Sequence, residues 1–185
     1  MAPAQEHMFD EEPLPPAVVF DCDFVINVLH ENEDFHDECA GFAGRLFDRG
    51  VGIVYSSLVR VDFWQGWRHA VKQKGLPLEI GGEPVRIRDL AKQREEWYQL
   101  GDQYLKLFLS LYDRYEVRVG PRLLDRAVKL MGRYNLGSHD ACLAAIAFHT
   151  DVTDIVSLDA DFRRVDGIHL WNSDIPARRL AARRR

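Results

Sequence analysis

The sequence predicts an α/β fold with three layers: a mostly parallel central sheet covered by helices on both faces. Short apolar segments with strand character alternate along the chain with longer segments whose apolar residues recur at helical spacing. Because parallel strands need a long crossover connection, usually a helix, this alternation favours a parallel sheet. The first apolar segment, residues 17–20, has the composition of a buried strand. At 185 residues the chain is long enough for one domain with a sizeable core.

The expected elements follow one another in a regular order. Gly50 marks the end of the second helix, and Pro121 suits the first turn of a later one. Strands are expected at residues 17–20, 52–55, 116–119, 154–158 and 168–171. Helices are expected at residues 23–29, 35–49, 58–74, 88–114, 121–134 and 138–150, with a turn or a single helical turn at 159–164.

Three regions differ from the rest of a domain expected at residues 17–173. Residues 1–16 are acidic and rich in proline, which predicts a flexible arm. Residues 75–84 are rich in glycine and proline and predict a loop or a small hairpin. Together with the long helix after them they form an expected insertion at about 75–114. Residues 174–185 form a basic tail that can attract a polyanion, although a solvated terminus explains its composition equally well.

The composition excludes several classes of protein. A hydrophobic content of 46% with 29% charged residues is ordinary for a globular protein, and no apolar run is long enough to span a membrane. The first residues have neither the basic region nor the apolar region of a secretory signal. The three cysteines are scattered, so a disulfide framework is not expected. These observations together predict a cytoplasmic protein.

Acidic residues follow the predicted strands at several places. Each lies near the end of a strand or in the first turns of the helix that comes next. Because the carboxyl ends of parallel strands meet at one edge of a sheet, where α/β folds bind ligands, these side chains are expected to converge. They are Asp21 and Asp23 after the first strand, Asp62 after the second, Asp140 in the helix at 138–150, and Asp159 and Asp161 after the fourth strand.

Clustered carboxylates indicate a metal site, because like charges a few ångströms apart resist joint ionisation unless a cation neutralises them. Hard oxygen ligands suit Mg²⁺ or Mn²⁺ and not zinc, and one or two such ions can activate water against a phosphodiester. The sequence contains no P-loop and no glycine-rich dinucleotide motif. Taken singly, Asp23, Asp140 and Asp161 are better explained as helix caps or first-turn acids, and it is the whole set that indicates a metal site.

Four stretches of the sequence resemble the PIN-domain ribonucleases, and in particular the VapC-type toxins of type II toxin–antitoxin systems. In the order of that family they are VVFDCDFVINVL, SSLVRVDFWQG, SHDACLAAIA and SLDADFRRVDGIHLW. The resemblance covers about residues 17–172. It implies a PIN-like α/β/α sandwich and a ribonuclease that depends on Mg²⁺ or Mn²⁺.

The resemblance also implies roles for individual residues. The implied catalytic acids are Asp21, Asp62, Asp140 and Asp159, and the implied metal ligands are Asp21, Asp140, Asp159 and Asp161. Asp23 and Ser157 would support these ligands, and Arg163 and Arg164 would contact RNA. The sequence departs from the family at Asp62, where the family usually has a longer glutamate, and this puts the coordination of the ion in doubt.

The resemblance further implies partners: an RNA substrate, a cognate antitoxin, and a second copy of the chain in a homodimer. The aromatic stripe of the helix at 88–114 is the expected contact surface for an antitoxin or a second copy. Two alternatives stay open. The Phe-Asp-x-Asp pattern also resembles the first motif of HAD-type phosphatases, with Asp21 as the nucleophile. A PIN-like binding protein with weakened catalysis would account for the aspartate at position 62.

Overall fold

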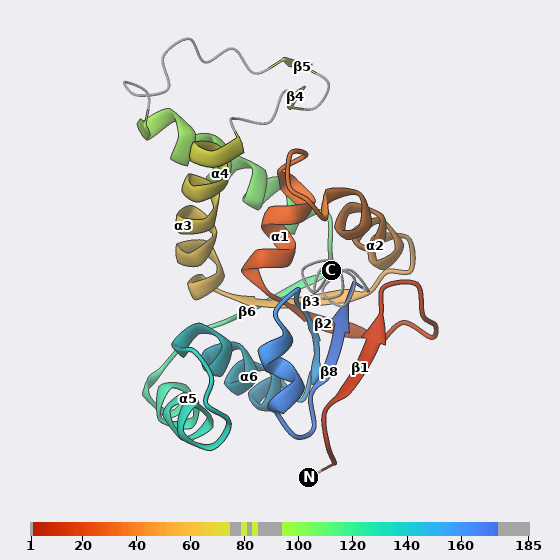
Figure 1. The fold of residues 1–185 in the computed structure, drawn as a ribbon, viewed down its shortest axis with the longest axis vertical. Coiled ribbons are helices and arrows are strands. Elements are labelled where there is room, and N and C mark those ends of the chain that lie inside the picture. Colours follow the sequence, from red (N-terminus) through yellow and green to blue (C-terminus); the bar gives the residue numbers. More distant parts are fainter. Residues whose placement is uncertain (1, 75–78, 81–82, 85–93, 174–185) are drawn as a thin grey trace, which may run out of the picture.

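The computed structural model of the chain describes residues 2–74, 79–80, 83–84 and 94–173, and in it six parallel strands form one sheet (Figure 1). The strand order is β1-β8-β7-β2-β3-β6. The predicted α/β fold class is therefore confirmed. The strands are β1 (Gln5–Met8), β2 (Ala17–Phe20), β3 (Gly52–Ser56), β6 (Arg114–Val117), β7 (Asp154–Val156) and β8 (His169–Asn172).

Helices cover both faces of the sheet, as Figure 1 shows. One face carries α1 (Cys22–Leu29), α2 (His36–Asp48), α3 (Ser57–Lys74) and α4 (Arg94–Ser110). The other face carries α5 (Pro121–Tyr134), α6 (Ser138–Thr150) and the short 3-10 helix η1 (Ala160–Arg164). Strand β2 supplies side chains to both layers: Val18 and Phe20 pack in the first core, and Val19 packs in the second. Its continuous apolar sequence follows from this double coverage.

The N-terminal residues correct one prediction. Residues 5–8 do not lie in a flexible arm, because β1 pairs with β8 along its whole length and extends the sheet. The His7 ring stacks on Trp171 with centroids 4.7 Å apart, and the Phe9 ring stacks on Phe42 at 4.3 Å. The side chains of β1 itself are exposed or half-buried, so no apolar periodicity marks the strand. Its pairing depends on backbone hydrogen bonds, which sequence patterns do not report.

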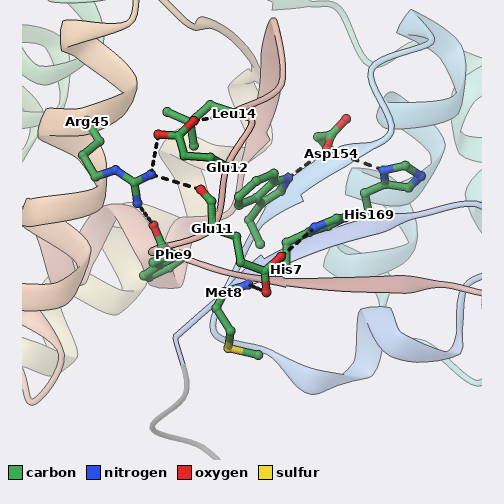
Figure 2. Close-up of polar contacts among 10 residues, drawn as sticks. His7, Met8, Phe9, Glu11, Glu12, Leu14, Arg45, Asp154 and His169 are labelled. Carbon is green, nitrogen blue, oxygen red and sulfur yellow. Dashed lines mark hydrogen bonds and ion pairs between the residues drawn. The ribbon is translucent and has the colours of Figure 1, made fainter.

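A single arginine of α2 fixes the segment that leads from β1 to β2 (Figure 2). The Arg45 guanidinium donates hydrogen bonds to the backbone oxygens of Phe9 and Glu11, and pairs with the Glu12 carboxylate at 2.8 Å. Glu12, one of the acidic residues that predicted a flexible arm, is therefore held against α2 by an ion pair. The segment holds β1 against the edge of the sheet.

The region around α4 differs from its prediction in two ways. The helix ends at Ser110, and the chain enters β6 at Arg114, two residues before the expected strand. In β6 only Val117 is buried, so the apolar pattern could not define where this edge strand begins. Strands β4 (Glu79–Ile80) and β5 (Glu83–Pro84) form the small antiparallel hairpin that the glycine- and proline-rich segment predicted. Residues 88–93 of the predicted helix and the basic tail at 174–185 lie outside the described residues.

Helices α3 and α4 approach each other closely at Gly101. A Cβ atom at this position would lie 2.8 Å from the indole ring of Trp67, which is fully buried. The Trp67 Nε1 donates a hydrogen bond to the backbone oxygen of Trp97 at 2.9 Å, which fixes the ring. The expected insertion therefore contributes, through α4, to the same core as the rest of the first layer.

Replacing Gly101 with alanine is expected to lower the stability of the fold by about 1–3 kcal/mol, because Trp67 has no space into which to move. Gly132 of α5 is the matched control, since nothing lies within 4 Å of a Cβ atom built there. Gly132→Ala is expected to raise stability by up to about 1 kcal/mol through helix propensity. Thermal unfolding followed by circular dichroism measures both, and equal melting temperatures for the two variants would contradict the proposed close packing.

Candidate functional site

The carboxyl edge of the sheet brings together acidic side chains from four segments of the chain. Asp21 follows β2 directly and is the N-cap residue of α1, where its side chain accepts a hydrogen bond from the Cys22 backbone N–H. Asp140 lies in the first turn of α6, and Asp159 is the N-cap residue of η1. Asp62 reaches the same edge from the second turn of α3. The predicted convergence of distant acids is therefore present in the structure.

Asp21 is the most enclosed of these acids, with a relative exposure of 9%. Its carboxylate accepts hydrogen bonds from the Cys22 backbone N–H and from the Ser157 hydroxyl, both at 2.6 Å. Burial raises the pKa of Asp21 to about 6, and the negative charges of Asp140 and Asp159 add to the increase. The two hydrogen bonds oppose this effect without cancelling it. In the absence of a cation, Asp21 therefore resists ionisation.

Asp23 connects α1 to the loop after β7. Its carboxylate accepts hydrogen bonds from the backbone N–H groups of Phe24 at 2.5 Å and Leu158 at 3.0 Å. The Ser157 hydroxyl, which donates to Asp21, in turn accepts a hydrogen bond from the Asp159 backbone N–H at 2.9 Å. Burial, followed by the charge of Asp21, raises the pKa of Asp23 well above its ordinary value. These contacts give Asp23 and Ser157 the positions of supporting residues around Asp21.

Three further carboxylates lie close enough to share one ion. Asp140, Asp159 and Asp161 each present a carboxylate oxygen, and these atoms lie within 4.8 Å of one another. Burial raises the pKa of Asp140, and the charges of Asp159 and Asp161 raise it further. Asp159 also accepts a hydrogen bond from the backbone N–H of Asp161 at 2.8 Å, which fixes the turn that carries both acids.

Asp62 has a partner that the sequence did not predict. The His139 Nδ1 lies 3.0 Å from an Asp62 carboxylate oxygen, although the His139 side chain is itself 54% exposed. Burial raises the pKa of Asp62 and Asp140 adds to the increase, whereas His139 opposes it. The only signal in the sequence was the place of His139 next to Asp140, at the start of α6. The motif that contains Asp62 and the motif that contains His139 are far apart in the sequence, and neither one alone indicates a contact between α3 and α6.

A buried hydroxyl at the same edge was also missed. Ser56 ends β3, the strand beside β2, and is fully buried. Among the described residues its Oγ has no hydrogen-bond partner. Its type and position match those of a helix cap, so nothing in the sequence separated it from one.

The two arginines predicted to contact RNA are engaged in ion pairs. The Arg163 guanidinium pairs with Glu6 of β1, and the Arg164 guanidinium pairs with Asp161. Their role toward RNA stays a prediction.

The donor set fits a hard divalent cation. Within the described residues, neither Asp21 nor Asp23 forms a salt bridge with a basic side chain, nor do Asp140 and Asp159. The raised pKa values of Asp21, Asp62 and Asp140 have the same physical origin: these carboxylates are buried or half-buried, and other carboxylates lie beside them. Mg²⁺ and Mn²⁺ prefer oxygen ligands and would remove this repulsion.

The fold and the site together define an α/β/α domain whose acidic centre lies at the carboxyl edge of a parallel sheet. The chain belongs to the PIN domain family, whose model matches residues 18–168. The resemblance to PIN domains that the sequence motifs indicated is therefore confirmed.

Solved structures of low sequence identity share the fold. VapBC2 from Rickettsia felis, bound to a DNA fragment from its promoter, matches with a TM-score of 0.56 and 14% identity over 85% of this chain and 99% of that chain. PAE2754 from Pyrobaculum aerophilum matches with a TM-score of 0.53 and 15% identity over 90% and 98% of the two chains. VapC20 from Mycobacterium tuberculosis, a toxin that cleaves the sarcin-ricin loop, matches with a TM-score of 0.52 and 13% identity over 78% and 92%.

No curated protein matches the chain in sequence. In the part of the chain that the structure describes, no helix has both the length and the apolar character needed to cross a membrane.

Proposed function

We propose that this protein is an endoribonuclease that depends on Mg²⁺ or Mn²⁺ and hydrolyses RNA phosphodiester bonds. The observation that carries the proposal is the convergence of Asp21, Asp140 and Asp159 at one edge of the sheet, in a chain of the PIN domain family. The VapC20 toxin has the same fold and cleaves the sarcin-ricin loop, which supports RNA as the substrate class. Membership of this family does not favour the phosphatase alternative.

The residues have distinct roles in this proposal. Asp140, Asp159 and Asp161 offer oxygens close enough for one ion. Asp21, which follows β2 and lies outside that group of three, is near enough for the charges of Asp140 and Asp159 to raise its pKa, and we assign it as a further ligand. A bound ion would activate water and stabilise the charge that develops on the leaving oxygen. Ser157 orients Asp21 by donating to the carboxylate oxygen at 2.6 Å.

Asp62 would hold a water molecule at the site, with His139 fixing the orientation of its carboxylate at 3.0 Å. This contact supports a catalytic role for Asp62, although its side chain is shorter than the glutamate that the family usually has there. The alternative of a binding protein with weakened catalysis predicts RNA binding without cleavage.

We further propose that the protein is the toxin of a toxin–antitoxin pair, acts in the cytoplasm as a homodimer, and is silenced by an antitoxin. The fold that it shares with the toxin–antitoxin protein VapBC2 supports this. The aromatic side chains Trp97, Phe108 and Tyr112 of the predicted contact stripe are buried in the core, whereas Leu107 and Leu111 are exposed. These two leucines and Tyr115, which is also exposed, are thus the part of that stripe available to a partner.

The test is RNA cleavage by the purified chain. Structured ribosomal RNA is incubated with the protein in 5 mM Mg²⁺, in 5 mM Mn²⁺, or in excess chelator, and the products are separated on a denaturing gel. Cleavage is expected with either metal and is expected to be lost in chelator. Release of phosphate from a phosphatase substrate serves as the control reaction and is not expected. Cleavage that continues undiminished in chelator would contradict a role for the metal.

A further inference from the structure

A groove of about 910 Å³ lies between α3 and α4. The two helices pack against each other and lie side by side in Figure 1. The lining includes two aromatic side chains, Trp64 from α3 and Tyr98 from α4, and three basic ones from α3: Arg68, His69 and Lys72. The groove therefore combines flat apolar surfaces with positive charge.

The basic side chains of the groove are available to a ligand. Asp102, the one acid among the described residues of the lining, pairs with Arg60 at 2.7 Å and with Lys106 at 2.6 Å. Arg68 and Lys72 are exposed, and neither forms a salt bridge with any acid that the structure describes. The positive charge in the groove is thus not neutralised by these acids, and it complements a polyanion.

The Trp64 ring is held in place and is partly open to solvent. Its Nε1 donates to the Asp102 carboxylate at 3.3 Å, and the Arg60 guanidinium lies over the ring, 5.4 Å from its centroid. Trp64 is half-buried, whereas the other three tryptophans, Trp67, Trp97 and Trp171, are buried. A ring that is already fixed loses little conformational freedom when a flat ligand stacks on it.

The groove and Asp62 of the acidic centre lie along the same face of α3. Gln65 and His69, which line it, lie three and seven residues after Asp62, so the three side chains share one face of the helix. With a rise of 1.5 Å per residue, His69 lies roughly 10 Å along the axis from Asp62. A strand that enters the acidic centre can thus continue into the groove.

We propose that this groove binds single-stranded RNA beside the phosphodiester that is cleaved. Bases stack on Trp64 and Tyr98, and backbone phosphates pair with Arg68 and Lys72. Aromatic platforms within a basic groove are the chemistry by which proteins hold single strands without reading their sequence. The proposal rests on the ribonuclease function proposed above. It identifies the surface that holds the part of the RNA next to the phosphodiester that is cleaved.

The test measures binding of a fluorescein-labelled 12-nucleotide oligouridylate by anisotropy, in an Asp21→Asn background with Mg²⁺ so that cleavage does not interfere. Arg68→Gln with Lys72→Gln is expected to weaken binding at least 5-fold at 100 mM salt. The slope of log K against log salt concentration is expected to fall by roughly 1.4, since each lost phosphate contact contributes about 0.7 for single strands. Arg114→Gln with Lys129→Gln, two exposed cations outside the groove, is the matched control and is expected to change neither quantity.

Stacking gives a second readout. The oligonucleotide is expected to quench tryptophan fluorescence in the Asp21→Asn chain, and the quenching is expected to disappear in Trp64→Leu. Unchanged affinity and salt slope in the groove variant would overturn the proposal. A groove variant that leaves RNA binding intact but dissociates a dimer in sedimentation would also overturn it, by assigning the groove to a second copy. If the chain with its native Asp21 cleaves no RNA but still binds it through the groove, the proposed ribonuclease function is contradicted and the proposed binding groove is supported.

Discussion

Replacing Asp21 with asparagine is expected to abolish RNA cleavage and at the same time to stabilise the metal-free protein. Asp21 is buried, and its pKa is raised to about 6 from an ordinary 3.8. At 1.36 kcal/mol for each unit of pKa, its ionisation at neutral pH costs the folded state about 3 kcal/mol. Asparagine carries no charge and keeps an oxygen for the Cys22 N–H, which donates to Asp21 at 2.6 Å.

Two measurements test this prediction. RNA cleavage is expected to fall at least 10³-fold, because an amide binds a hard cation poorly, and the double variant with Asp140→Asn is expected to be equally inactive. The melting temperature in chelator at pH 7.5 is expected to rise by up to roughly 6–12 °C, at about 2–4 °C for each kcal/mol. Asp125→Asn on the exposed face of α5 is the control for both measurements. Cleavage that survives in the double variant would exclude the acidic centre as the active site.

The opposite effects on activity and stability separate a functional site from a structural one. If Asp21 served only as the N-cap of α1, the variant would lose little stability, since asparagine also caps helices well, and cleavage would continue. A cluster of buried carboxylates instead stores repulsion that a cation relieves. Burial of the Asp21 carboxylate, together with the charges of Asp140 and Asp159 beside it, is what distinguishes Asp21 from a simple cap.

Most of the site could be predicted because strand ends define it. Asp21 and Asp159 follow strands of a parallel sheet, and Asp140 starts a helix at the same edge, so local sequence fixes their place. Ser157 was predicted only as a supporting hydroxyl, and the structure gives it contacts to Asp21 and Asp159. The contact of His139 with Asp62 could not be predicted, because it depends on how α3 and α6 are placed relative to each other in the folded chain.

Strand β1 shows the other limit of prediction from sequence. Its position depends on backbone pairing with β8, and contacts between distant residues, such as Phe9 on Phe42 and the bonds from Arg45 to the backbone, hold the segment that follows it. Proline and acidic residues dominate the composition of this segment and indicate an arm. A backbone pairing at a sheet edge needs no apolar pattern, so composition and periodicity both pointed away from it.

The stability of the metal-free protein is expected to fall as the pH rises through the interval from about 4 to about 6. A carboxyl group whose pKa is higher in the folded state than in the unfolded state binds more protons when folded, so raising the pH removes stability. The pKa of Asp21, about 6 against 3.8, sets this interval, and the raised pKa values of Asp23, Asp62 and Asp140 act in the same direction. Comparing the chain with Asp21→Asn isolates the first contribution: the two free energies of unfolding should differ little near pH 4 and by up to about 3 kcal/mol at pH 7.

Metal binding is expected to reverse this loss. A cation that replaces protons at the acidic centre binds more tightly as the pH rises, and at one hundred times its dissociation constant it stabilises the folded state by about 2.7 kcal/mol. Mn²⁺ should therefore raise the melting temperature by roughly 5–10 °C at pH 7.5, at about 2–4 °C for each kcal/mol, and by much less at pH 5. Asp140→Asn should reduce the increase, whereas Asp125→Asn should keep it. An increase of the same size at both pH values would mean that the ion binds away from the titrating carboxylates, because only those groups couple its affinity to protons in this interval.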